Sequence, residues 1–295
     1  MRPNSTKRTA AIVLVLLVLV IGVFGYISSR KAPPVTEPIV KADTGPKHAV
    51  IGQSVNGHSI DTYTYGHGST TLIFVGGIHG GYEWNSVFLA YRFMDYLTAN
   101  PDIIPQNISV TVIPSANPDG VYMVTGKEGR FAVGDVSTSS KVLAKARFNA
   151  NNIDLNRNFD CKWQPKSTWQ SKVVSAGTKA FSEPEASALR DYILPTHPAA
   201  VVFWHSQSNG VYASQCKDGI LPGTLGIMEA YSKASLYPAI KTFDAYATTG
   251  AADDWLAAEN IPAITVELKT HETIEWDRNL AGVKALFGYF SEKRI

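Results

Sequence analysis

The hydrophobic pattern beyond residue 48 changes repeatedly between strand-like and helix-like spacing. Residues 49–65 alternate apolar and polar side chains and break at Asn56-Gly57, a dipeptide typical of hairpin turns. Residues 84–99 place apolar groups three and four positions apart, which predicts a helix. Buried strands are expected at 71–75, 108–113, 199–204 and 262–267. This order predicts an α/β domain with a mixed, mostly parallel twisted sheet covered by helices on both faces.

Two more helices are expected in the second half of the chain, at residues 182–194 and 278–292. Ser182 stands three residues before Glu185, so we expect a capping box at the start of the first of them.

The first thirty residues have a different pattern. Residues 10–27 form an uncharged run of eighteen after a basic flank, and eighteen helical residues span roughly 27 Å. We therefore predict a cytoplasmic N-terminus at 1–9, a transmembrane signal-anchor at 10–28, an extended proline-containing linker at 29–47 and a catalytic domain at 48–295. A cleaved signal peptide and a buried soluble helix are the rival interpretations. The signal-anchor and the cleaved signal peptide would both place the domain outside the cytoplasm.

The overall composition narrows the class of partner. A net charge of +2 on 295 residues gives no electrostatic reason to expect nucleic acid. The sequence holds no internal repeat and specifies no oligomeric state. Cys161 and Cys216 allow one intramolecular disulfide, which an oxidising compartment would permit.

Polar side chains follow several of the predicted strands. His79 and Glu83 come after the strand at 71–75, His205 directly follows 199–204, and Glu267 ends the strand near 266. Ligands of open α/β sheets bind beyond the carboxyl ends of the strands, so these side chains should meet at one edge.

Two imidazoles and one carboxylate suit a catalytic zinc ion, which typically takes three protein ligands and keeps one position open. His79, Glu83 and His205 would supply that set, and Glu267 could act as general base. A single histidine at a strand end is more often an ordinary hydrogen-bonded group, so the set matters more than its members. The remaining histidines lack such company and are expected to be solvated: His48, His58, His67, His197 and His271.

Several longer motifs resemble the zinc metallocarboxypeptidases, also called funnelins. The most specific is "RFNANNIDLNRNFD" at 147–160. Other segments occur in the same order as in that family: "PSANPDG" at 114–120, "FSEPEASALRDYI" at 181–193, "FWHSQS" at 203–208, "YATTGAADDW" at 246–255 and "ITVEL" at 264–268. The resemblance covers about residues 50 to 293 and implies a carboxypeptidase-like fold.

The resemblance also implies a role for each matching residue. One zinc ion per chain would be bound by His79, Glu83 and His205, and Glu267 would take a proton from the zinc-activated water. Arg147 would stabilise the negative charge that develops on the scissile carbonyl oxygen.

The resemblance places further residues around the substrate. Asn156 and Arg157 would bind the terminal carboxylate, and Tyr246 would close over the bound residue. Asp154 would accept a hydrogen bond from a ligand histidine. Asp253 would lie on the pocket floor and favour a cationic side chain, unless it pairs with a neighbouring protein group. The two cysteines would lie near the mouth of the cleft, where a disulfide would brace the substrate-binding loop.

The metal motif departs from the family at one point. The usual spacing is H-x-x-E, whereas His79 and Glu83 are separated by Gly80, Gly81 and Tyr82. We expect the two glycines to let the loop absorb the extra residue, so that Glu83 still reaches the metal. The alternative is that Glu83 caps the following helix and that another group completes the site.

The resemblance implies a zinc exopeptidase that hydrolyses the C-terminal bond of a peptide or a cell-wall peptide. Three alternatives stay open: an amidase acting on a γ-linked peptidoglycan stem, a deacylase of N-acyl amino acids, and an inactive peptidase fold that only binds. A serine hydrolase is disfavoured, because "WHSQS" lacks both glycines of a nucleophile elbow.

Overall fold

The computed structural model describes Leu16 and residues 45–292. The predicted anchor at 10–28 and most of the linker therefore lie outside the described residues, apart from Leu16. Within the part that is described, no helix has both the length and the apolar content needed to cross a membrane.

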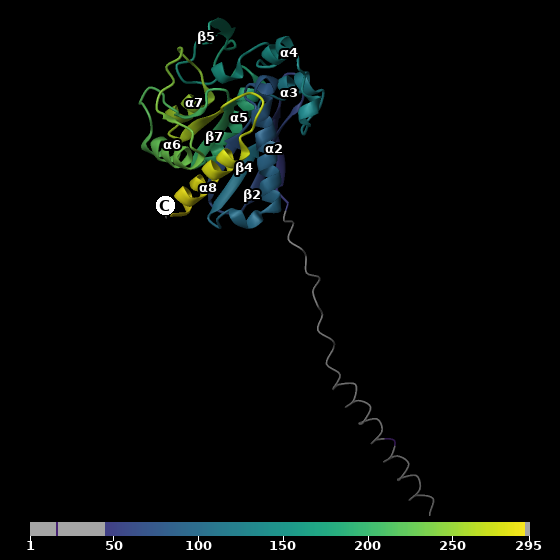
Figure 1. The fold of residues 1–295 in the computed structure, drawn as a ribbon, viewed down its shortest axis with the longest axis vertical. Coiled ribbons are helices and arrows are strands. Elements are labelled where there is room, and N and C mark those ends of the chain that lie inside the picture. Colours follow the sequence, from purple (N-terminus) through teal and green to yellow (C-terminus); the bar gives the residue numbers. More distant parts are fainter. Residues whose placement is uncertain (1–15, 17–44, 293–295) are drawn as a thin grey trace, which may run out of the picture. The chain divides into compact units, whose positions relative to one another are not determined.

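The domain is built on one eight-stranded sheet (Figure 1). The strands follow the spatial order β1-β2-β4-β3-β7-β10-β8-β9. Pairing is parallel from β4 through β3 and β7 to β10 and again between β8 and β9, and antiparallel at β1-β2, β2-β4 and β10-β8. In chain order the strands are β1 (Lys47–Gln53), β2 (Ser59–Gly66), β3 (Thr70–Val75), β4 (Ile108–Ile113), β7 (Ala200–Ser206), β8 (Gly210–Ala213), β9 (Ala239–Ile240) and β10 (Ala263–Leu268).

Helices cover both faces of this sheet. The longer ones are α2 (Trp84–Ala99), α3 (Pro118–Thr125), α5 (Pro184–Thr196), α6 (Pro222–Ser235), α7 (Ala252–Ala258) and α8 (Trp276–Glu292). On one face α2 and α8 lie side by side, with the rings of Tyr96 and Trp276 5.5 Å apart (Figure 1). Leu72, Phe74 and Trp204 belong to the core beneath them. Ile73, Val75 and Phe203 point the other way, into a second core with α5 and α7.

The period-two alternation of the central strands explains this arrangement, because successive side chains fill different cores. Every residue of β4 and of β7 is buried. The structure thus confirms the predicted α/β domain with a large, mostly parallel sheet and helices on both faces.

The remaining elements of the described residues are short. They are α4 (Ser140–Lys145), the 3-10 turns η1 (Gly80–Glu83), η2 (Pro101–Ile103), η3 (Val133–Asp135) and η4 (Leu155–Arg157), and a separate hairpin of β5 (Lys166–Trp169) and β6 (Lys172–Ser175). The hydrophobic pattern did not indicate this hairpin, nor β8, β9, α3, α6 or α7.

The expected capping box at Ser182 is wrong. Helix α5 begins at Pro184, its N-cap is Glu183, and that cap makes no side-chain hydrogen bond. The Ser182 hydroxyl donates to the Glu183 carboxylate instead. Glu185 is engaged elsewhere, because its carboxylate accepts from the backbone N–H of Val55 and from Asn149. Tertiary partners therefore outcompete the local cap.

Candidate metal centre and cleft

The loop between β3 and α2 carries His79 as the N-cap of the 3-10 turn η1 and Glu83 as the last residue of that turn. Its glycines are required by close packing. Gly80 has a φ of +48°, and a Cβ there would lie 2.7 Å from the carbonyl oxygen of Ala146. A Cβ on Gly81 would lie 2.4 Å from the carbonyl oxygen of Gly120. Glu83 lies beside His79 in spite of the longer spacing, with its Oε1 4.0 Å from Nε2 of His79.

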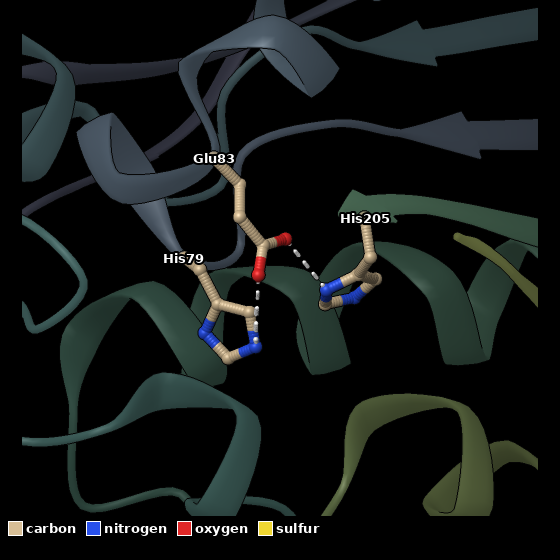
Figure 2. A group of neighbouring side chains, drawn as sticks. All are labelled: His79, Glu83 and His205. Atoms are coloured by element: carbon tan, nitrogen blue, oxygen red, sulfur yellow. Dashed lines mark hydrogen bonds and ion pairs between the residues drawn. The ribbon is translucent and has the colours of Figure 1, made fainter. Parts of the chain in front are cut away.

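The structure brings the three predicted ligands together (Figure 2). One ligand atom from each of His79, Glu83 and His205 lies within 4.8 Å of the others. The Glu83 carboxylate is central, with Oε2 3.0 Å from Nδ1 of His205 and Oε1 4.0 Å from Nε2 of His79. All three residues are at most 4% exposed.

This donor set fits a zinc ion. Burial, and then the charge of Arg147, lower the pKa of His79 well below its ordinary value, so the ring is the neutral ligand that a metal needs. Burial alone would lower the pKa of His205, but the Glu83 carboxylate raises it. Nδ1 of His79 is buried and finds no hydrogen-bond partner among the described residues, although Oδ1 of Asp154 lies 3.6 Å away. A buried carboxylate between two imidazoles is the arrangement a bound dication would stabilise.

Glu267 lies beside His205 because their strands are paired. In the parallel β7-β10 ladder, Glu267 is the direct partner of His205. Its Oε2 accepts a hydrogen bond from the backbone N–H of Ser208 at 3.2 Å. Burial and the charge of Glu83 raise the pKa of Glu267 to about 7. A carboxyl group with that pKa can take up and release a proton near neutral pH.

Arg147 is a buried cation held in place by Asp154. Its Nε and Nη2 both lie 3.0 Å from Oδ2 of Asp154, while Nη1 is 3.7 Å from Oε1 of Glu83. The guanidinium carbon also lies 4.5 Å from the centre of the Trp169 ring. These contacts fix a positive charge at the edge of the metal centre.

Asn156 and Arg157 are the last two residues of the 3-10 turn η4. Oδ1 of Asn156 accepts from the backbone N–H of Ala252, which fixes the side-chain amide. The Arg157 guanidinium donates to the carbonyl oxygens of Thr168 and Asn156. Three of its five N–H groups are thus engaged, and the other two have no hydrogen-bond partner among the described residues.

Asp253 lines the same cleft, at the start of α7. Its Oδ2 accepts a hydrogen bond from the hydroxyl of Thr265, so Asp253 has a neighbouring protein partner, the alternative that the sequence left open. The neighbouring Asp254, which the sequence reading did not single out, also lines the cleft and accepts from the backbone N–H of Gln215. Burial, and then the charge of Asp253, raise the pKa of Asp254 to about 8. Tyr246 belongs to the irregular loop before α7, and its ring packs on Phe243.

The two cysteines form a disulfide, with Cα atoms 6.0 Å apart. The carbonyl oxygen of Cys161 accepts from the backbone N–H of Gly250, three residues before Asp253. Cys216 follows Gln215, which binds Asp254. The crosslink therefore joins two segments that both hold the start of α7.

One cavity of about 300 Å³ is lined by the three predicted metal ligands and by Glu267, Arg147, Asn156, Arg157, Tyr246, Asp253 and Asp254. Asp154 and the two cysteines are not among its lining residues. The cavity also has lining residues that the sequence analysis did not identify, among them Tyr82, Trp169, Ser206, Tyr212 and His271. The expectation that His271 is solvated is wrong, since it is partly buried and hydrogen-bonded to Ser206 at 2.7 Å. Its position four residues after Glu267 was the signal that could have identified it. His58 is also engaged, with its ring stacked on Tyr122.

Comparison with known proteins gives a consistent result. A family model described as zinc carboxypeptidase matches residues 46–280. Gamma-D-glutamyl-L-diamino acid endopeptidase 1 of Lysinibacillus sphaericus is 26% identical over 238 residues, which are 74% of this chain and 59% of that protein. Carboxypeptidase B of Helicoverpa zea is 32% identical over 160 residues, which are 52% of this chain and 35% of that protein. The chain thus spans less than two thirds of the length of either relative.

The fold also has a counterpart among solved structures. Bovine thrombin-activatable fibrinolysis inhibitor, in complex with tick carboxypeptidase inhibitor, superimposes with a TM-score of 0.65 at 20% identity. The match covers 84% of this chain and 91% of that one.

Proposed function

The chain belongs to the zinc carboxypeptidase family, and from this premise we propose that it is a zinc-dependent exopeptidase that hydrolyses the C-terminal peptide bond of its substrate. The observation that supports this most is the meeting of a buried His79, Glu83 and His205 set with Glu267 and Arg147 in one cavity. A zinc ion held by the three ligands would supply Lewis-acid polarisation and lower the pKa of water.

Glu267 is the proposed proton carrier. Its carboxylate takes a proton from the attacking water and returns it to the leaving amine, and a pKa of about 7 suits both transfers. The Ser208 N–H holds one oxygen, so the carboxylate is oriented before substrate arrives. Strand pairing with His205 in the β7-β10 ladder keeps Glu267 beside the metal ligands.

Arg147 is the proposed electrostatic stabiliser. Asp154 and the ring of Trp169 hold its guanidinium before any substrate binds. A preorganised cation of this kind stabilises the negative charge that develops on the carbonyl oxygen and needs no reorganisation during the reaction.

Asn156 and Arg157 are proposed to bind the terminal carboxylate. The fixed Asn156 amide and the two remaining N–H groups of Arg157 are donors, which a carboxylate requires. Such a pair would explain an exopeptidase, because a peptide that continues past the cleaved bond has no carboxylate there. Tyr246, which lies in the irregular loop before α7, would close over the bound residue.

Asp253 is proposed to favour a cationic terminal side chain. Thr265 donates to Oδ2, and Oδ1 has no hydrogen-bond partner within the part of the chain that the structure describes, so it would be available to an ammonium or guanidinium group. A panel of peptides that differ only in the last residue tests this. Equal rates on Lys, Arg, Ala and Phe would remove the proposed preference.

A γ-linked cell-wall peptide is the second candidate substrate. The name of the relative from Lysinibacillus sphaericus describes action on a γ-D-glutamyl bond to a diamino acid, and a diamino acid carries the amino group that Asp253 would bind. Incubation with α-linked tripeptides and with purified muropeptides, followed by mass spectrometry, separates the two. Release of one C-terminal residue from α-linked peptides supports the exopeptidase. Cleavage confined to the γ-linked bond supports the amidase, and no cleavage by zinc-loaded protein supports a binding module.

We also propose that the domain acts outside the cytoplasm, with residues 10–28 as its membrane anchor. The Cys161–Cys216 disulfide supports an oxidising compartment, and the uncharged run supports the anchor. Protease accessibility of the domain in intact cells tests the location. Full protection that ends only on lysis would contradict it.

A further inference from the structure

A chain of three polar side chains ties the loop after β10 to the start of α2. The Asn85 amide donates to the carbonyl oxygens of Thr270 and Thr273, at 2.7 and 2.9 Å. Its Oδ1 lies 3.0 Å from the hydroxyl of Ser206, and that hydroxyl lies 2.7 Å from Nδ1 of His271. Asn85 is fully buried and His271 reaches the cleft.

These contacts fix the hydrogen positions. Because the Asn85 amide nitrogen faces two carbonyl oxygens, its Oδ1 is the atom that faces Ser206, and it can only accept. Ser206 has one hydroxyl hydrogen and donates it to Asn85. The remaining contact of the hydroxyl is with Nδ1 of His271, so Nδ1 must carry the hydrogen and donate it. In the neutral ring, Nε2 is then a hydrogen-bond acceptor.

The His271 ring, which carries this acceptor, lines the cleft. His271 packs edge-to-face against Tyr82, with ring centres 4.6 Å apart, and Tyr82 packs in the same way against Trp169 at 5.2 Å. We call Tyr82, Trp169 and His271 the aromatic wall of the cleft. It is made from different segments than the Asn156, Arg157 and Asp253 group proposed for the terminal residue.

We propose that His271 is a substrate-positioning residue whose Nε2 accepts a hydrogen bond from an N–H group on the amino side of the cleaved bond. This inference rests on the proposed peptidase function, in which Asn156, Arg157 and Asp253 bind the terminal residue. An acceptor at this place favours an amide N–H or an ammonium group and disfavours a carboxylate. Tyr82, the extra residue of the metal motif, holds the ring in position.

Two variants separate this role from a purely structural one. His271→Asn keeps an N–H donor near the position of Nδ1, and so keeps the bond to Ser206, but has nothing at Nε2. His271→Gln places a carbonyl oxygen near the position of Nε2 and keeps an acceptor there. His67→Asn is the matched control, because His67 is an exposed histidine away from the cleft.

The substrates are a pair of N-acyl dipeptides that differ only at the residue before the cleaved bond, with N–H in one and N-methyl in the other. We expect the wild type and the His67→Asn control to prefer the N–H substrate in kcat/KM by about three- to tenfold, the effect of one hydrogen bond. His271→Asn should lose most of this preference through KM, and His271→Gln should keep part of it. An equal loss on both substrates in His271→Asn would overturn the proposal.

Two further measurements keep the proposal testable apart from turnover. Long-range ¹H–¹⁵N spectra should show His271 with Nδ1 protonated and Nε2 unprotonated, and the opposite tautomer would contradict it. If zinc-loaded wild type cleaves neither substrate, the proposed function fails. Calorimetric binding of the same two peptides to wild type and His271→Asn then decides the inference, with a preference for N–H in wild type alone as the supporting result and equal preferences as the contrary one.

Discussion

Two walls of the cleft are built by different means. His205 and Glu267 are adjacent partners in the β7-β10 ladder, so backbone hydrogen bonds and buried strands fix their separation. The aromatic wall of Tyr82, Trp169 and His271 comes from a turn, a hairpin and a loop, and it is held by ring packing and one polar chain. The sheet therefore positions His205 and Glu267, whereas side-chain contacts position the aromatic wall.

This difference has an experimental consequence. A change at the strand ends should reduce kcat and leave the fold intact, because the ladder does not depend on the Glu267 side chain. A change in the loops should act mainly through KM or through stability, because the contacts there also hold the loops together.

The largest effect is expected from Glu267→Gln. Removal of the proton acceptor should lower kcat by about 10²- to 10⁴-fold, while the protein folds and keeps its zinc. Steady-state kinetics with metal analysis and circular dichroism on the same samples measure this. A variant that retains most of the wild-type rate would refute the proton-transfer role of Glu267. It would also contradict the expectation that changes at the strand ends reduce kcat.

The next largest effect is expected from removal of the Cys161–Cys216 disulfide. Replacement of both Cys161 and Cys216 by serine removes a crosslink between positions 55 apart in sequence. We expect a loss of about 4 kcal/mol in the free energy of unfolding and a several-fold increase in KM, with kcat little changed. Urea unfolding and kinetics test both parts. If kcat falls and KM does not, the disulfide supports the metal centre rather than the substrate loops.

Asp253→Asn should have a smaller and selective effect. The carboxamide keeps the size of the side chain and an acceptor for Thr265 but removes the charge. We expect kcat/KM for peptides ending in Lys or Arg to fall about 10- to 100-fold relative to peptides ending in a neutral residue. A uniform loss across all terminal residues would show that Asp253 has only a structural role.

The smallest effect is a change in pH dependence. The folded-state pKa of Asp254 is raised to about 8, above the ordinary value of 3.8. A raised pKa means that the folded protein holds the proton more tightly than the unfolded chain, so this contribution is present below pH 4 and is lost as the pH rises toward 8. Between pH 5 and 8 the wild type should lose about 1–3 kcal/mol more stability than Asp254→Asn. Chemical denaturation across this range tests it, and parallel curves for the two proteins would contradict it.

Much of the sheet could be predicted from the sequence because its strands are long and apolar. The runs at β3, β4, β7 and β10 gave strand positions within two residues of those observed, and polar residues at their ends indicated where the cleft lies. The longer 147–160 motif then extended the site to Arg147, Asn156 and Arg157.

The rest could not be predicted because it depends on tertiary contacts. The β5-β6 hairpin has little apolar periodicity, yet it contributes Trp169 to the cleft. In the sequence, Asn85 has no feature that distinguishes it from other helix residues. Only the structure shows that its amide binds the loop that carries His271. The capping box failed for the same reason, since Glu185 is used by Val55 and Asn149.

Glu83 provides the most direct test of the central claim, that His79, Glu83 and His205 hold one zinc ion despite the longer spacing. Its carboxylate lies between the two imidazoles, so Glu83→Ala removes the central ligand of the set. Zinc content by mass spectrometry, with affinity from chelator competition, should show about one zinc per chain in the wild type and a 10-fold or larger loss of affinity in the variant. Stoichiometric zinc bound with unchanged affinity in Glu83→Ala would contradict the claim.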